Sequence, residues 1–175
     1  MPTAWARRAN NNLRKIPYNL VEPEHPVLHR PAGRVVSFGM EELDVIAHRL
    51  FLTCKMNGGV AIAAPQVGIP LQIVVVDEGD HGVVFCNPVV ETGGKLVAGT
   101  ESCLSLPGRL FRVPRHHRAV VAGQDINGEP FGADVSGFNA RKWQHEASHL
   151  AGRLLSDDFP EVLLPNGPQT KGFAG

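Results

Sequence analysis

The nine residues QHEASHLAG, 144–152, place two histidines four positions apart, with a glutamate directly after the first. In a helix, residues i and i+4 lie on the same face, so His145 and His149 can bind one metal ion between them. Glu146 stands beside them in the position of a general base. Two protein ligands do not complete such a site, so a third must come from elsewhere in the chain.

The helix that carries this motif is predicted to span about 137–151, with Ser136 as its cap. Its other face carries apolar residues that can pack in a core, namely Trp143, Ala147 and Leu150. Earlier segments predict a helix from residue 40 to the NGG at 57–59, strands at 71–76 and 83–86, and a hairpin of 119–126 and 130–135 with a two-residue NG turn. The pattern predicts an α+β fold, with antiparallel sheets and a hairpin packed around a buried late helix.

Length and composition indicate one globular domain, because 175 residues with 43% apolar content can bury a sizeable core. Lys+Arg and Asp+Glu both number 17, so no overall charge favours nucleic acid or a membrane surface. No apolar run approaches the ~18 residues of a transmembrane helix. The odd count of 3 cysteines argues against a disulfide framework and for a reducing compartment such as the cytoplasm.

The chain is predicted to have three parts. Residues 1–18 form a short basic arm, for which an organellar transit sequence is the lesser alternative. Residues 19–160 form the catalytic domain. The proline-interrupted residues 161–175 form an irregular C-terminal tail.

The third metal ligand is predicted upstream of the motif. The metzincin pattern matches Gly152, but it requires a histidine where Leu155 stands. Glu161, the downstream glutamate, is too close to the motif and lies in a proline-flanked stretch. Upstream, ESCLSLPG at 101–108 offers Cys103, which would complete a Cys-His-His set and leave a fourth position open for water. Taken alone, Cys103 would be better explained as a small buried apolar residue.

A third segment, GGVAIAAPQVG at 58–68, has the features of an oxyanion site. Its glycines and alanines allow another backbone to approach closely, and Pro65 fixes the turn before Gln66. A glutamine amide in this place can donate a hydrogen bond to a developing oxyanion.

In this order and at these separations, GVAIAAPQVG (59–68), ESCLS (101–105) and QHEASHLAG (144–152) resemble the signature segments of the peptide deformylases. The likeness extends over residues 19–156. It implies a metal-dependent hydrolase that removes the formyl group from the N-terminal formylmethionine of newly made polypeptides and releases formate. The resemblance implies that the metal ligands are Cys103, His145 and His149, and that the catalytic glutamate is Glu146. It implies two oxyanion donors, the side chain of Gln66 and the backbone N–H of Leu104.

The resemblance also implies one divalent metal per chain, Fe(II) in the cell with zinc or nickel in preparations. Ligand counting alone favours zinc. The implied partners are formylmethionyl nascent peptides and, transiently, the ribosome exit region, with a monomeric protein and no membrane or nucleic-acid site. The substrate backbone is expected to add as a strand beside Val60 and Ala61 and near Ser102. Phe138, on the inward face of the helix, is expected to line the methionine pocket.

Three positions depart from the family pattern: Ala61 and Ser102 replace glycines, and Ser148 replaces the aspartate of H-E-x-D-H. That aspartate is expected to pair with the arginine that stands here as Arg115. Since no ligand, base or oxyanion donor is missing, activity is predicted. The alternatives are a related protein that has lost catalysis, an inhibitor-resistant copy in which Ala61 narrows the cleft, and a zinc protease.

Overall fold

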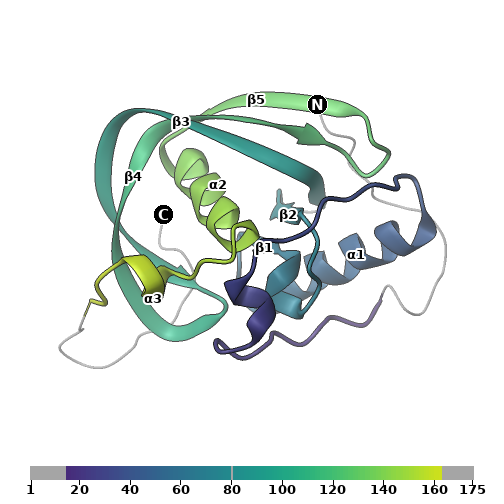
Figure 1. Cartoon of the computed structure of the whole chain (residues 1–175), viewed down its shortest axis with the longest axis horizontal. Helices are drawn as coiled ribbons and strands as arrows, with labels where there is room; N and C mark the ends of the chain where they lie inside the picture. Colours follow the sequence, from purple (N-terminus) through teal and green to yellow (C-terminus); the bar gives the residue numbers. More distant parts are fainter. Residues whose placement is uncertain (1–14, 80, 163–175) are drawn as a thin grey trace.

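A computed structural model describes residues 15–79 and 81–162. Five strands form one sheet in the order β1-β2-β3-β4-β5, in which every neighbouring pair is antiparallel. The strands are β1 Ala61–Ala63, β2 Ile73–Asp77, β3 Gly82–Cys103, β4 Leu106–Gln124 and β5 Pro130–Ser136. The helices are α1 Glu41–Met56, α2 Gly137–Leu150 and α3 Leu155–Asp158, with 3-10 turns η2 Pro26–His29 and η3 Ala64–Val67 (Figure 1).

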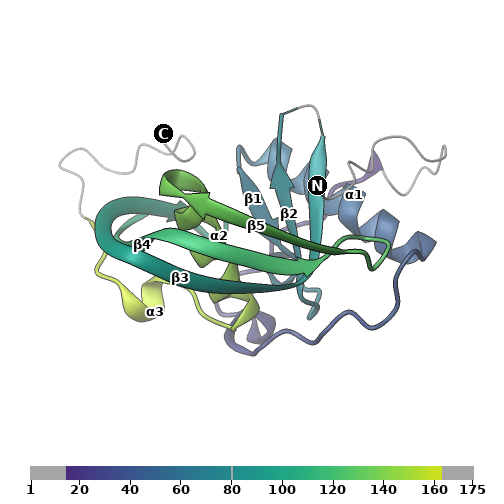
Figure 2. The same ribbon diagram turned by 90° about the horizontal axis from the view of Figure 1, so that it is seen from above.

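The predicted α+β class and the late helix are confirmed. The strands form one sheet because the long strand β3 pairs with β2 at one end and with β4 along the rest of its length. Residues 82–86 of β3 pair with β2, and residues 86–103 pair with β4. The register shifts between residues 86 and 89 and again between 93 and 96. Such irregularities bend a strand, and Figure 2 shows β1 and β2 turned away from the layer of β3, β4 and β5.

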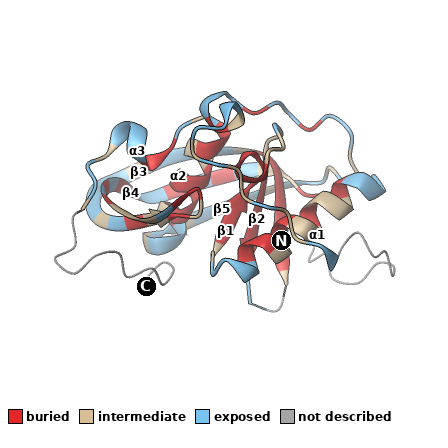
Figure 3. Ribbon diagram, turned by 90° about the horizontal axis from the view of Figure 1, so that it is seen from below, coloured by how far each residue is buried: buried red, intermediate tan, exposed pale blue. Residues whose placement is uncertain are grey.

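Both faces of β1 and β2 are covered, which explains the continuous apolar run at 73–76. Alternate residues of a strand point to opposite faces. Ile62, Ile73 and Val75 pack in one cluster with Leu50 of α1. The alternate set packs in a second cluster with Trp143 of α2 and consists of Ala61, Ala63, Val74 and Val76. Figure 3 shows this buried centre, in which each fully buried large side chain contributes roughly 1.5–3 kcal/mol.

The β4–β5 hairpin is confirmed, but the predicted two-residue turn is wrong. Gln124 pairs with Pro130, so residues 125–129 form the loop. The Asp125 carboxylate accepts hydrogen bonds from the backbone N–H groups of Asn127 (2.8 Å) and Glu129 (3.0 Å). This side chain closes a wider loop than the NG pair alone would form. Ser136 does occupy the N-cap position of α2, but its side chain makes no capping hydrogen bond.

Most of the predicted N-terminal arm and C-terminal tail lies outside the described residues. Where described, both segments contact the domain: the Tyr18 N–H donates to Thr53 Oγ1 (2.8 Å), and the Val162 N–H donates to the Leu110 carbonyl (2.7 Å). The boundaries at residues 18/19 and 160/161 remain a prediction. Within the described residues, no helix combines the length and the apolar character needed to cross a membrane.

Replacement of Gly152 by alanine is expected to lower the free energy of unfolding by about 2 to 4 kcal/mol. Gly152 follows Ala151, the C-cap of α2, with φ +75°, and a Cβ built there would lie 2.5–2.8 Å from backbone atoms of Arg30. Left-handed strain and overpacking each cost on the order of 1 to 2 kcal/mol. Urea unfolding followed by circular dichroism measures the loss.

Gly39→Ala is the matched control, because Gly39 has φ +69° and nothing within 4 Å of a built Cβ. It carries the backbone strain without the collision, so a loss of about 1 kcal/mol is expected. Equal losses in the two variants would show that the contact with Arg30 relaxes without cost.

Candidate active site

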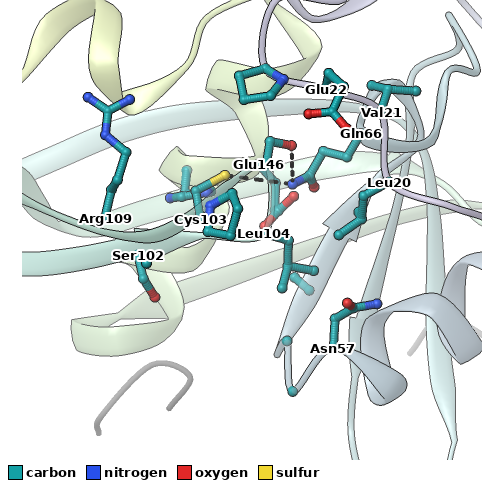
Figure 4. A pocket seen from close by; sticks show the side chains of 18 of the residues that line it. Leu20, Val21, Glu22, Asn57, Gln66, Ser102, Cys103, Leu104, Arg109 and Glu146 are labelled. Atoms are coloured by element: carbon teal, nitrogen blue, oxygen red, sulfur yellow. Dashed lines mark hydrogen bonds between the residues drawn. The ribbon is translucent and has the colours of Figure 1, made fainter. Parts of the chain in front are cut away.

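The three motifs found in the sequence meet in one cavity of about 680 Å³. Cys103 ends β3 and is followed by a turn of two residues before β4, since Cys103 pairs with Leu106. The histidines lie on α2, and Gln66 lies in the 3-10 turn η3. Figure 4 shows Gln66, Cys103 and Glu146 pointing toward one another from these three elements.

The predicted ligand set converges on one point. Nε2 of His149 lies 3.2 Å from both Cys103 Sγ and His145 Nε2, and all three ligand atoms lie within 4.8 Å of one another. Ligands of a tetrahedral zinc-type site stand about 3.3–3.6 Å apart at ordinary bond lengths. Each of the three side chains is at most 6% exposed.

The chemistry of the donors also fits a cation. The Nδ1 atom of His145 lies 3.0 Å from Glu101 Oε2, which favours a proton on Nδ1 and leaves the Nε2 lone pair facing the site. Burial alone would raise the pKa of the Cys103 thiol, but His149 and His145 hold that pKa well below its usual range. A thiolate and two imidazole nitrogens facing one point are the donors of a soft divalent metal site.

Glu101 is the centre of an ion network that the motifs did not reveal. Its fully buried carboxylate accepts hydrogen bonds from Arg115 (Nε and Nη2, both 3.0 Å) and from Arg141 Nη1 (2.7 Å), besides its contact with His145. The sequence motifs assign no role to this glutamate. The available signal was alternation: residues 101 and 103 are two apart in a strand, so both side chains point to the same face.

Arg115 does lie beside position 148, as expected, but its main partner is Glu101. Its Nη1 atom lies 3.5 Å from Ser148 Oγ and 3.4 Å from the Gln144 carbonyl, whereas its two bonds to Glu101 are each 3.0 Å. Ser148 itself donates to the Gln144 carbonyl at 2.9 Å. The buried arginine therefore has a carboxylate partner although position 148 provides none.

Glu146 is only 4% exposed, and its Oε2 atom has no hydrogen-bond partner among the described residues. Burial raises the pKa of its carboxyl group above the ordinary value, against the influence of His145 and His149. A carboxyl group that is close to the ligand atoms and has a raised pKa is suited to accept and return a proton during a reaction.

The Gln66 amide is held at both ends. Its Oε1 accepts from the Ala63 N–H at 2.9 Å, and its Nε2 donates to Ser105 Oγ at 3.1 Å. Cys103 Sγ lies 3.7 Å from the same Nε2. The amide nitrogen therefore faces the ligand set, where it can donate to an oxyanion.

The residues expected to bind substrate are placed unequally. Ala61 and Ser102 line the cavity, as does Leu104, the predicted oxyanion donor. Val60 does not line it, and the Val60 carbonyl accepts a hydrogen bond from the Asp77 N–H of β2. Phe138, expected to line the methionine pocket, does not line this cavity. It is 41% exposed and borders a separate surface depression. Seven residues of helix, about 10 Å, separate it from His145 and carry it beyond the cavity.

Glu101→Gln is expected to weaken metal binding by roughly 10- to 100-fold, the usual effect of losing a partner that orients a ligand. It should also lower the free energy of unfolding by about 3–5 kcal/mol, because the buried guanidinium of Arg115 loses its counter-charge. Competitive metal titration and urea unfolding measure the two effects. Glu91→Gln, at an exposed position of the same strand, serves as the control and should change neither.

The stability difference between the parent protein and Glu101→Gln should become smaller in acid. Burial would raise the pKa of Glu101, but hydrogen bonds with His145 and Arg115 lower it to about 2 from its ordinary value of 4.5. A depressed pKa contributes stability that is present above the unfolded value and is lost as the pH falls through the folded value. The stability gap between the metal-free parent and Glu101→Gln should therefore narrow between pH 4.5 and 2; a constant gap would contradict it.

Comparisons with known proteins agree with this geometry. A family model described as polypeptide deformylase matches residues 17–162. Peptide deformylase 2 of Streptomyces coelicolor is 43% identical over 138 residues, covering 75% of this chain and 76% of that protein. Peptide deformylase 2 of Bordetella bronchiseptica is 36% identical over 159 residues, covering 80% and 90%.

The fold is also that of solved deformylases. The crystal structure of a peptide deformylase from Synechococcus elongatus in complex with actinonin superposes with a TM-score of 0.80 at 35% identity, covering 91% of this chain and 88% of that one. The peptide deformylase of Thermotoga maritima gives a TM-score of 0.77 at 34% identity, covering 81% and 96%. The chain belongs to the peptide deformylase family.

Proposed function

We propose that this protein is a metal-dependent peptide deformylase, which hydrolyses the formyl group of N-terminal formylmethionine on newly made polypeptides and releases formate. The observation that carries the proposal is one cavity lined by Cys103, His145, Glu146 and Gln66, with His149 completing the cluster of ligand atoms behind it. In a member of this family, that set provides the metal ligands, the proton-transferring carboxylate and one of the two oxyanion donors.

Glu146 is proposed as the general base and then the general acid. Its buried carboxylate takes a proton from the attacking water, and it returns that proton to the departing amine when the C–N bond breaks. The Gln66 Nε2 and the Leu104 backbone N–H are proposed to donate to the oxygen that becomes negative. A divalent cation held by Cys103, His145 and His149 would supply Lewis acidity that makes water a nucleophile at neutral pH.

The edge of β1 is proposed to align the substrate. β1 is the first strand of the sheet order, so one of its sides has no strand partner in the described sheet. Because the Val60 carbonyl points to β2, the backbone groups of Ala61 point the opposite way, toward the cavity. A peptide can add there as a strand, with Ser102 on the other side. Main-chain pairing of this kind is independent of the substrate's side chains, which suits an enzyme that acts on many N-termini.

The cation is proposed to be Fe(II) in the cell, with zinc or nickel binding in preparations. Anaerobic purification, metal analysis and formate release from formyl-Met-Ala-Ser test function and metal identity together. We expect one equivalent of metal and steady formate release. A metal-replete sample without turnover would overturn the function and favour a non-catalytic relative, and casein cleavage without formate release would favour a protease.

Ser148→Asp is expected to leave turnover within about tenfold of the parent protein, because Arg115 already has Glu101 as its partner and position 148 provides no ligand. Steady-state formate release per bound metal measures the effect. Ser156→Ala, at an exposed residue of α3, controls for handling. A larger change would show that the charge at position 148 governs the site.

The compartment and partners belong to the same proposal. Formylmethionyl nascent chains meet such an enzyme in the bacterial cytoplasm, near the ribosome exit, with the protein acting as a monomer. The relatives named above from Streptomyces and Bordetella support a bacterial setting. Sedimentation with translating ribosomes tests the contact with the ribosome, and size-exclusion chromatography tests the monomeric state.

A further inference from the structure

We propose that Ser105 is a positioning residue for the reaction: its hydroxyl fixes the Gln66 amide and thereby holds the two oxyanion donors in one geometry. The inference rests on the proposed function and extends it to a residue outside the ligands, the base and the donors. Ser105 is 2% exposed and accepts a hydrogen bond from Gln66 Nε2 at 3.1 Å.

The two donors come from different parts of the fold, so some contact must set their relative position. Gln66 lies in η3, which follows β1, whereas Leu104 lies in the turn between β3 and β4. Ser105 is the second residue of that turn. Its bond to Gln66 therefore links the two elements directly beside the metal ligands, across 39 residues of sequence.

The bond also selects which way the amide nitrogen points. Oε1 is already used by the Ala63 N–H at 2.9 Å, which fixes the amide against a flip. Nε2 carries two hydrogens, and it lies near two acceptors, Ser105 Oγ at 3.1 Å and Cys103 Sγ at 3.7 Å. With one hydrogen held by Ser105, the other is directed to the side of the cavity where Cys103 Sγ lies. Without the hydroxyl, that constraint is lost and the amide nitrogen can turn away from the position of the oxyanion.

The test is a double-mutant cycle of Ser105→Ala and Gln66→Ala in the metal-loaded protein, with kcat and KM measured for formyl-Met-Ala-Ser per bound metal. Ser105→Ala should lower kcat by roughly 10- to 100-fold through misplacement of Gln66, with KM nearly unchanged. Gln66→Ala should lower kcat by about 100- to 1,000-fold. If Ser105 acts through Gln66, its removal from the Gln66→Ala protein should cost less than about twofold.

A readout apart from activity completes the test. Nitrogen-15 NMR of the zinc-loaded protein should show the Gln66 side-chain amide signals displaced in Ser105→Ala and restored toward the parent positions in Ser105→Thr, which keeps the hydroxyl. Equal kcat losses in both backgrounds, unmoved amide signals, or loss of folding in Ser105→Ala would each overturn the inference. Absence of formate release by the parent protein, with the amide signals displaced as expected, would instead overturn the proposed function alone.

Discussion

Glu146→Gln should abolish most formate release, with kcat falling by roughly 10²- to 10⁴-fold, the contribution of a positioned general base and acid. The amide has the shape of the carboxyl group but cannot take a proton from water. Metal content should stay at the parent level, because Glu146 does not belong to the Cys103, His145 and His149 cluster. Formate release per bound metal, measured beside metal analysis, separates the two effects.

The same variant should be at least as stable as the parent protein. Burial raises the pKa of Glu146, so the folded protein disfavours its charged form. A neutral amide removes that cost, and a gain of stability with loss of activity is typical of residues selected for catalysis. Retained turnover in Glu146→Gln would remove this residue from the mechanism, whereas loss of metal would point to a role in binding the cation.

Cys103→Ser should lose metal as well as activity. The thiolate form of Cys103 is favoured because the adjacent His149 and His145 lower its pKa against the effect of burial. A serine hydroxyl stays protonated and is a poor ligand for a soft divalent cation. Affinity should fall by more than about 100-fold, since even residues that only orient ligands contribute about 10- to 100-fold. Competitive titration with a chelator measures it.

Cys86→Ala is the matched control for a buried cysteine. Cys86 lies in the core beside α1, and burial raises the pKa of its thiol to about 12, so it remains neutral. Its replacement should cost some stability through a small cavity but leave metal affinity at the parent level. Equal metal loss in the two variants would mean that Cys103 contributes packing rather than a bond to the cation.

The parts of the fold that follow local patterns were predictable. The apolar spacing before NGG gave α1, and the i, i+4 histidines with an apolar opposite face gave α2, because helical periodicity depends on residues a few positions apart. The hairpin of β4 and β5 was also predictable, because strand alternation and a turn signal likewise depend on nearby residues. Its loop was not, since the Asp125 carboxylate, rather than the NG pair, closes the turn.

The length of β3 was not predictable from its sequence. Residues 91–100 are largely exposed and include glycines at 93, 94 and 99, so they lack the alternation that marks a strand. Pairing with β4 holds them in the sheet. The prediction for Phe138 was wrong for a related reason. Helical spacing gives its face of α2, but the packing of α2 on the sheet decides where along the helix the cavity ends.

By itself, the sequence determined the candidate roles of His145, His149 and Glu146, because these depend on residue type and short spacing. Cys103 and Gln66 were candidates by residue type, and the resemblance to the peptide deformylases joined them to the same proposed site. Only the tertiary structure decided what holds them there. Glu101 contacts residues 14 to 44 positions away, and Ser105 contacts Gln66 across 39. Alternation can place Glu101 on the same face as Cys103, but the distant partners of Glu101 and Ser105 are set only once these elements have packed together.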